Sequence, residues 1–280
     1  MGVLDDIVIH KRAELVERRA CRPLGALEAE CRGLPGALDF EGALRPAAGQ
    51  RVRLIAEVKK ASPSQGVIRA DLDPAVQART YAGAGAAAVS VLTDAKYFRG
   101  SLEDLIAVRR AVRVPILRKE FIVDEYQLWE SRAAGADAVL LIVAALDGGA
   151  LGDLLHAAKG VGLGALVEVH TAAELEHALR VAAPVIGVNN RDLQSLATTL
   201  DTSLDLLPRI PPGPVAVSES GIFTAADVER VVGAGAHAVL VGEGLVRALD
   251  VGAKVRELLL VASSLSPRGE EGQGEGRALK

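Results

Sequence analysis

The stretch Ile55-Ala56-Glu57-Val58-Lys59-Lys60-Ala61-Ser62-Pro63-Ser64-Gln65-Gly66 decides the fold, because it begins as an apolar strand and ends as a turn of small residues. Glu57 and Lys59 are two residues apart. Side chains alternate across a strand, so both point to the same face. A carboxylate and an ammonium at the tip of a buried strand are costly unless they pair or serve a function. They are therefore either a structural ion pair or part of a catalytic site, and these residues alone favour neither reading.

The composition of the 280-residue chain indicates a large apolar core. Half of the residues are hydrophobic but only 3% are aromatic, so the core consists of Ala, Val, Leu and Ile. Such a core suits parallel strands that are buried on both faces. The net charge is −4 with both signs interspersed, and no basic block is typical of nucleic-acid binding. We therefore expect a small-molecule substrate and no nucleic-acid partner.

Cysteine usage and the N-terminal sequence favour a cytoplasmic protein. The two cysteines, Cys21 and Cys31, form no Cys-x-x-Cys pair, and the five histidines show no metal-ligand spacing, so we expect no metal. We interpret the histidines, His170 included, as solvated or packed. The N-terminus carries acids where a signal peptide carries bases, and apolar runs such as Ala138–Leu146 are too short to span a bilayer. We expect a soluble monomer that does not bind membranes.

One supersecondary unit repeats along the chain from about residue 51. Joints such as Ala134-Gly135-Ala136-Asp137 and Ala234-Gly235-Ala236-His237 share one design, in which a helix ends on glycine before a buried strand. Segments of helical period separate short apolar runs. These runs predict eight strands, at Leu54–Val58, Ala87–Leu92, Pro115–Lys119, Ala138–Val143, Ala165–Val169, Val185–Val188, Val215–Ser218 and Ala238–Val241.

Eight strand–helix units predict an α/β protein with the (β/α)8 TIM-barrel fold and an N-terminal helical extension. The competing fold, an open doubly wound sheet, should carry Gly-x-Gly-x-x-Gly after its first strand, and none occurs there. We assign residues 1–50 to the extension, 51–262 to the barrel and 263–280 to a disordered tail rich in Gly and Glu. The extension is expected to pack on the barrel as two helices, with a membrane-surface helix as the alternative.

Polar residues end six of the eight predicted strands, at the edge where the active sites of such barrels lie. Two lysines and two glutamates that face one pocket can divide acid and base roles if their surroundings separate their pKa values. Counting by two along each strand selects the inward-facing set Glu57, Lys59, Lys119, Glu168, Asn189 and Ser220.

Two further groups of residues lie near the same strand ends. Gly221 and Gly242 come before helix starts after strands seven and eight, which is typical of a phosphate site in barrels. Glu243 is unfavourable beside a phosphate unless its side chain points away. Phe98 and Phe121 follow strand ends and are candidates for lining a pocket for an aromatic ring.

At this point the chain resembles the indole-3-glycerol phosphate synthase family, from about residue 4 to about residue 260. The resemblance implies a cofactor-free carboxy-lyase of tryptophan biosynthesis. Its substrate is 1-(2-carboxyphenylamino)-1-deoxyribulose 5-phosphate, whose ring closure releases CO2 and then water. The matching stretches, in the order of the family, are Ile55–Ser64, Leu117–Phe121, Val167–His170, Gly187–Leu193, Ser218–Ile222 and Leu240–Glu243.

The resemblance also implies roles for individual residues. Lys119 would be the general acid for the carbonyl oxygen and Lys59 the second acid, while the base role stays open between Glu57 and Glu168. Asn189 would hold the hydroxyl group. Ser220, also counted with the catalytic residues, would contact the phosphate. The implied substrate contacts are Ser62, Pro63, Phe98, Phe121, Leu140, Arg191, Gly221, Leu240, Gly242 and Glu243, with Arg191 on the anthranilate carboxylate.

Other phosphate-binding barrels are the alternatives. Phosphoribosylanthranilate isomerase uses a cysteine and an aspartate at strand ends, whereas both cysteines here precede the barrel. A Schiff-base aldolase would place a lysine on strand six, where this chain has Asn189. A non-catalytic phosphate-binding barrel would be expected to lack Lys119 or Glu168, and both are present.

Overall fold

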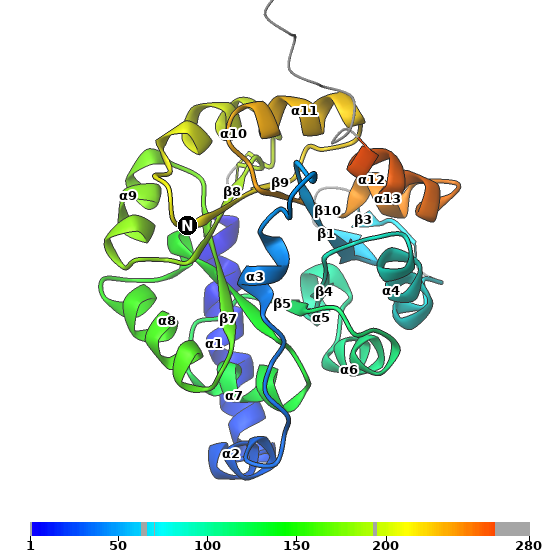
Figure 1. The fold of residues 1–280 in the computed structure, drawn as a ribbon. Coiled ribbons are helices and arrows are strands. Elements are labelled where there is room, and N and C mark those ends of the chain that lie inside the picture. The colour runs from blue at the N-terminus through cyan, green and yellow to red at the C-terminus, as the bar shows by residue number, and fades with distance from the viewer. Residues whose placement is uncertain (1, 63–65, 70, 193–194, 261–280) are drawn as a thin grey trace, which may run out of the picture.

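The computed structural model describes residues 2–62, 66–69, 71–192 and 195–260, and its main body is a closed barrel of eight parallel strands (Figure 1). β1 pairs with both β10 and β4, and this double pairing closes the sheet. All eight predicted strands are present, and their ends lie within one residue of those predicted. The TIM-barrel prediction is confirmed. The barrel strands are β1 Arg53–Val58, β4 Ala88–Leu92, β5 Ile116–Lys119, β6 Ala138–Ile142, β7 Gly164–Val169, β8 Val185–Asn189, β9 Val215–Glu219 and β10 Ala238–Val241.

Helices on the outside connect successive strands of the barrel (Figure 1). Five of them begin at a residue whose side chain accepts a backbone N–H of the first turn, namely Asp73, Asp94, Ser101, Thr171 and Thr224. The short strands β2 (Ala61–Ser62) and β3 (Gly66–Val67) pair after β1. The helices are α4 Pro74–Gly83, α5 Ala95–Phe98, α6 Leu102–Ala111, α7 Tyr126–Ala133, α8 Ala150–Gly160, α9 Ala172–Arg180, α10 Asp201–Leu206, α11 Ala225–Gly233, α12 Glu243–Val246 and α13 Val251–Leu260, with 3-10 turns η1 Val143–Ala145 and η2 Leu207–Arg209.

Side chains of each strand alternate between the barrel interior and the surrounding helices. The apolar side chains that fill the inside of the barrel form one cluster, called the interior cluster below. In β1, Ile55 belongs to this cluster, whereas Leu54 and Ala56 pack against the helices. In β9 the interior residues are Val215 and Val217. Side chains at every second residue of a strand point to the same side. The residue two positions after the last interior apolar residue of each strand therefore points into the mouth of the barrel. This alternation decides which polar residues at the strand ends can meet.

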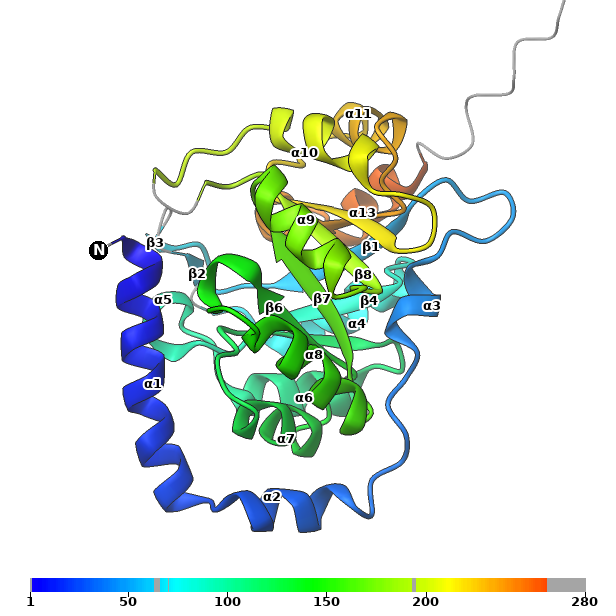
Figure 2. The ribbon, with the colours of Figure 1, turned by 90° about the vertical axis from the view of Figure 1, so that its left-hand side faces the viewer.

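The N-terminal extension covers both ends of the barrel. It consists of α1 Val3–Cys21, α2 Leu24–Cys31 and α3 Phe40–Leu44. Figure 2 shows α1 running beside one end of the barrel and α3 on the opposite side. Phe40 and Leu44 of α3 belong to the interior cluster, and Leu4 and Val8 of α1 pack against that cluster, as does Phe121. The two long helices agree with the prediction; α3 was not predicted.

A buried lysine fixes α1 to the barrel. Lys11 is 0% exposed, and its Nζ lies 2.9 Å from Asp94 Oδ2, 3.1 Å from Glu120 Oε1 and 2.8 Å from Glu14 Oε2. Asp94 and Glu120 come from the ends of β4 and β5, so the contact joins the extension to the mouth of the barrel. Among the described helices, none is long and apolar enough to cross a membrane. The predicted tail, residues 263–280, lies outside the described residues.

Candidate active site

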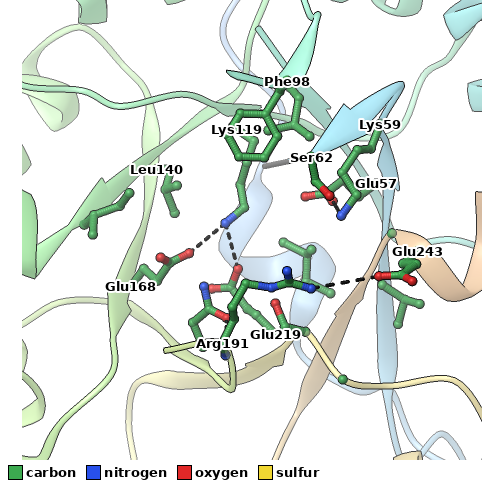
Figure 3. Close-up of a pocket in the computed structure, with 18 of the residues that line it drawn as sticks. Glu57, Lys59, Ser62, Phe98, Lys119, Leu140, Glu168, Arg191, Glu219 and Glu243 are labelled. Carbon is green, nitrogen blue, oxygen red and sulfur yellow. Dashed lines mark hydrogen bonds and ion pairs between the residues drawn. The ribbon is translucent and has the colours of Figure 1, made fainter. Parts of the chain in front are cut away.

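A pocket at the C-terminal ends of the strands brings together the residues selected from the sequence (Figure 3). They come from all parts of the barrel, although up to 186 residues (57 to 243) separate them along the chain. Pro63 lies outside the described residues, and the individual roles stay predictions. The predicted site residues that line the pocket are Glu57, Lys59, Ser62, Phe98, Lys119, Phe121, Leu140, Glu168, Asn189, Arg191, Ser220, Gly221, Leu240, Gly242 and Glu243.

Lys119, the last residue of β5, projects between two carboxylates. Its Nζ donates to Glu168 Oε2 at 2.7 Å and to Glu219 Oε2 at 3.0 Å, as Figure 3 shows. Burial alone would lower the pKa of Lys119, but the charges of Glu168, Glu219 and Glu57 outweigh it and raise this pKa above its ordinary value. Lys119 is therefore charged at neutral pH and can donate a proton.

The two carboxylates that hold Lys119 differ in acidity. Burial would raise the pKa of Glu168, but Lys119 and His170 outweigh it and lower this pKa to about 2. Burial raises the pKa of Glu219 to about 7 despite Lys119, and the neighbouring charges of Glu168 and Glu57 add to that rise. At neutral pH Glu168 is thus a carboxylate, whereas Glu219 holds a proton more readily. The pair can hold one proton near the substrate without either group being displaced.

Glu219 was not among the predicted site residues, and the inward assignment of Ser220 by counting was wrong. The interior residues of β9 are Val215 and Val217, so the next inward position is Glu219. Ser220 follows the end of the strand with φ 65°, which takes it out of the alternation, although it still lines the pocket. Counting from Val215 and Val217 would have selected Glu219 from the sequence.

Glycine leaves room for the Glu219 side chain. A Cβ atom at Gly187, on the neighbouring strand β8, would lie 2.0 Å from Glu219 Oε1. Real Cβ atoms do not approach other atoms so closely, so any larger residue at this position would displace the carboxylate from Lys119. Gly187 is therefore part of what positions the site.

A second ammonium–carboxylate pair lies across the pocket from Glu168 (Figure 3). Lys59 Nζ lies 2.8 Å from Glu57 Oε1. Here too a glycine makes room: a Cβ atom at Gly242 would lie 2.4 Å from Glu57 Oε1 and 3.0 Å from Lys59 Nζ. The pocket thus has two separate acid–base pairs on opposite walls, and a substrate between them can meet both.

Glu243 is neutralised by arginine. Its carboxylate lies 3.1 Å from Arg247 Nε and 3.9 Å from Arg191 Nη2. The negative charge at this end of the pocket is therefore shared with two guanidinium groups. Next to it, Ser220 (φ 65°) and Gly221 (φ 74°) form a turn with two consecutive left-handed residues. Turns of this kind expose backbone N–H groups that bind anions.

The remaining wall of the pocket is apolar and partly aromatic. The ring centroids of Phe98 and Phe121 are 6.2 Å apart with an interplanar angle of 40°. Leu140 of β6 and Leu240 of β10 line the same pocket. A planar aromatic ligand can be held between these side chains, as the sequence predicted.

Neither a metal cluster nor a cysteine is found in this pocket. Within the described residues, no group of three or more His, Cys, Asp or Glu side chains is arranged to hold a metal ion. Cys21 and Cys31 lie on α1 and α2, and neither lines the pocket. A reaction carried by a cysteine at a strand end is therefore excluded for this pocket.

Comparison with known proteins gives consistent matches over nearly the whole chain. The family model described as "Indole-3-glycerol phosphate synthase" matches residues 4–258. A protein of that name from Laribacter hongkongensis is 49% identical over 258 residues, covering 91% of this chain and 98% of the relative. One from Roseiflexus castenholzii is 51% identical over 264 residues, covering 91% and 97%.

Solved structures that resemble this one share its fold at low identity. Thiamine phosphate pyrophosphorylase from Pyrococcus furiosus aligns with a TM-score of 0.58 and 15% identity, over 77% of this chain and 98% of that chain. 3-Hexulose-6-phosphate synthase from Salmonella typhimurium aligns with a TM-score of 0.60 and 16% identity, over 75% and 98%. These likenesses support the barrel and say nothing further about the site.

Proposed function

Since this chain belongs to the indole-3-glycerol phosphate synthase family, we propose that it closes the indole ring of 1-(2-carboxyphenylamino)-1-deoxyribulose 5-phosphate. The observation that carries the proposal is Lys119, held between Glu168 and Glu219 in a pocket with an aromatic wall. In this reaction the ring carbon that bears the carboxylate attacks the ribulose carbonyl. CO2 then leaves, and water follows.

The first step needs a general acid. As the new carbon–carbon bond forms, negative charge develops on the carbonyl oxygen, and Lys119 is the acid that protonates it. Loss of CO2 returns the electron pair to the ring. Glu168 and Glu219 hold the ammonium of Lys119 toward the centre of the pocket, which reduces the reorganisation that this step requires.

The dehydration step needs an acid and a base. Lys59 is the acid for the departing hydroxyl, from the opposite wall, with Asn189 holding that hydroxyl. Glu57 and Glu168 are the two candidates for the base that removes the last proton. Each already contacts a lysine, at 2.8 Å for Glu57 and 2.7 Å for Glu168, so either can pass a proton on.

Substrate binding uses the rest of the lining. Phe98, Phe121 and Leu140 hold the aryl ring. Arg191 binds the anthranilate carboxylate through its planar fork. The phosphate binds at the turn of Ser220 and Gly221 and at Gly242, where Glu243 interacts with Arg247 and Arg191.

We also propose that the protein works as a cytoplasmic monomer without a metal or cofactor, and that residues 1–50, 51–262 and 263–280 form extension, barrel and tail. Size-exclusion chromatography with light scattering tests the monomeric state. A stable dimer would contradict the proposed state.

Replacing Lys119 tests the reaction and the general acid together. Lys119→Ala should reduce kcat by about 10²- to 10⁴-fold, the usual contribution of a general acid. The measurement is the rise of indole fluorescence after mixing enzyme and substrate in buffer with a chelator. Lys159→Ala, on the exposed face of α8, is the control and should keep full activity. Near-normal activity of the Lys119 variant would refute its assignment as the acid.

Replacing Arg191 tests the carboxylate contact. Arg191→Ala should raise KM about ten- to hundredfold, since it removes a charge-assisted hydrogen-bonded pair, and should lower kcat less. Steady-state kinetics measure both constants. Arg209→Ala, which removes an exposed pair with Asp205 on the outside of the barrel, is the control. An unchanged KM for the Arg191 variant argues against this role.

A further inference from the structure

His170 is a buried titratable residue that the reaction scheme above does not use. It follows β7 directly, two residues after Glu168, and it precedes α9. Its side chain is only 9% exposed, and it does not line the pocket. It contacts Glu168, which does line the pocket, and so lies in the layer behind that carboxylate.

The imidazole ring of His170 lies between two carboxylates. Its Nδ1 lies 3.2 Å from Glu174 Oε2, and its Nε2 lies 3.5 Å from Glu168 Oε1. Glu174 is fixed in place, because its Oε2 also accepts the backbone N–H of His170 at 2.8 Å and its Oε1 accepts the Thr171 hydroxyl at 3.2 Å. We assign a proton to Nδ1 because only a donor there satisfies the Glu174 carboxylate.

This assignment determines what faces Glu168. The buried Nε2 atom has no hydrogen-bond partner. In a neutral ring its lone pair would point at the Glu168 carboxylate, which is unfavourable. In an imidazolium an N–H group would point there, and a small movement would complete the hydrogen bond. The geometry therefore favours the doubly protonated ring.

The charges around His170 act in the same direction. The groups that face it are Glu168 on β7, Glu174 on α9 and Glu219 on β9, and Lys119 on β5 lies beyond Glu168. Burial would lower the pKa of His170, but the hydrogen bond to Glu174 and the charges of the three carboxylates raise it above its ordinary value.

We propose that protonated His170 is a positioning residue, which holds Glu168 as an oriented carboxylate while Lys119 protonates the substrate. Glu168 Oε2 accepts from Lys119, and Lys119 becomes neutral when it protonates the substrate. The imidazolium at Oε1 is then the remaining cation, and it keeps Glu168 charged and in place. This inference rests on the proposed function, because it needs Lys119 and Glu168 to act in that reaction.

Two amide substitutions separate this role from a purely structural one. A glutamine amide reaches the position of Nε2 and can donate to Glu168, whereas an asparagine amide reaches only Nδ1 and can donate to Glu174. We expect His170→Asn to lose kcat roughly ten- to hundredfold, as for one hydrogen bond to a charged group, and His170→Gln to lose less. KM should stay unchanged in both variants.

The exposed His156→Gln on α8 is the control for these variants and should match the wild type. The proposal would be overturned if His170→Asn kept the full kcat or a higher kcat than His170→Gln. His170 would then only anchor α9 through Glu174.

The pH profile of kcat gives a second readout. His170 acts in its protonated form, so its contribution is present at low pH and is lost as pH rises through its raised pKa. The wild type should therefore show an alkaline decline in kcat that His170→Gln lacks. An identical alkaline decline in both proteins would overturn the proposal.

An NMR titration tests the contact without any turnover. In protein labelled at histidine, Glu168→Gln should lower the pKa of His170, whose signal is assigned from its loss in His170→Gln. An unchanged pKa would overturn the inference even if the enzyme is active. If the wild type had no synthase activity but Glu168→Gln still lowered the pKa of His170, the proposed function alone would be refuted. The contact between His170 and Glu168 would then be established.

Discussion

Glu168 and Glu219 bind the same ammonium group, yet their environments give the two carboxyl groups different pKa values. Glu168 has Lys119 on one oxygen and His170 near the other, whereas Glu219 has Lys119 on one oxygen and no hydrogen-bond partner on its buried Oε1. A carboxylate with one unpartnered oxygen in a dry site is costly to ionise. The unpartnered oxygen adds to burial and to the charges of Glu168 and Glu57 in raising the pKa of Glu219, whereas Lys119, His170 and Asn189 lower that of Glu168.

This difference predicts opposite effects of amide substitutions on stability. The pKa of Glu219 is raised to about 7 on folding, so the residue favours folding at low pH and loses this effect as pH rises toward 7. Glu219→Gln should therefore have a higher Tm than the wild type at pH 8 and a smaller difference at pH 5. Thermal unfolding followed by circular dichroism at both pH values measures this.

The matched variant is Glu168→Gln. The pKa of Glu168 is lowered to about 2, so its charged form stabilises the fold at both pH values and the variant should have a lower Tm. A lower Tm for Glu219→Gln at pH 8 would mean that the charged Glu219 stabilises the fold through Lys119.

The sequence predicted the candidate site wherever the inward or outward direction of a side chain could be found by counting along a strand. Glu57, Lys119 and Glu168 each continue an unbroken alternation of buried residues, and they line the pocket as expected. The count is reliable only inside a strand, because Ser220, one residue past the end of β9, has left-handed backbone geometry. The contact between His170 and Glu168 could not be predicted, since it depends on where α9 places Glu174.

At the scale of elements, the contact between α1 and the barrel is electrostatic at its centre. Lys11 is surrounded by Asp94, Glu120 and Glu14, and its ammonium has no exposure to solvent. Glu120 also accepts the Thr93 hydroxyl and the Phe121 backbone N–H. The extension is thus bonded to the residue after Lys119, and its position is coupled to the shape of the pocket.

Removing that ammonium should be strongly destabilising. Lys11→Met removes the ammonium from the buried carboxylate of Asp94 and leaves Glu120 with Arg118, 3.6 Å away, as its cation. Breaking a buried pair in this way costs about 3–5 kcal/mol. Equilibrium urea denaturation measures the loss. Arg19→Met, on the same helix, removes a solvent-exposed pair with Asp124 and should cost less than about 1 kcal/mol. Equal losses in the two variants would contradict a special role for Lys11.

The strands were easier to predict than the short elements. Strands buried on both faces appear in the sequence as apolar runs of four to six residues, and their bounds follow directly. Helix α3 has five residues, too few to show a period; Asp39 caps its first turn, and its contact with the barrel interior holds it in place. Tertiary packing, rather than local sequence, decides such an element.

At the scale of the whole molecule, one apolar column fills the barrel from end to end. It begins with Phe40 and Leu44 of α3, passes through Leu166 and reaches Leu140 and Leu240 below the pocket. The chemistry lies at one end and the plug of α3 lies at the other (Figure 2). Stability and activity should therefore be separable by substitutions at the two ends.

Phe40→Ala tests this separation. Phe40 is 2% exposed, so its truncation should cost about 3–5 kcal/mol and lower Tm by roughly 10 °C. The pocket lies at the opposite end, and packed barrel strands separate the two sites. We therefore expect kcat and KM at 25 °C to stay within about twofold of the wild type. Leu38→Ala, nearby but 40% exposed, is the control and should change stability by less than about 1 kcal/mol. A large loss of kcat in a folded Phe40 variant would show instead that the interior column couples the plug to the catalytic lysine.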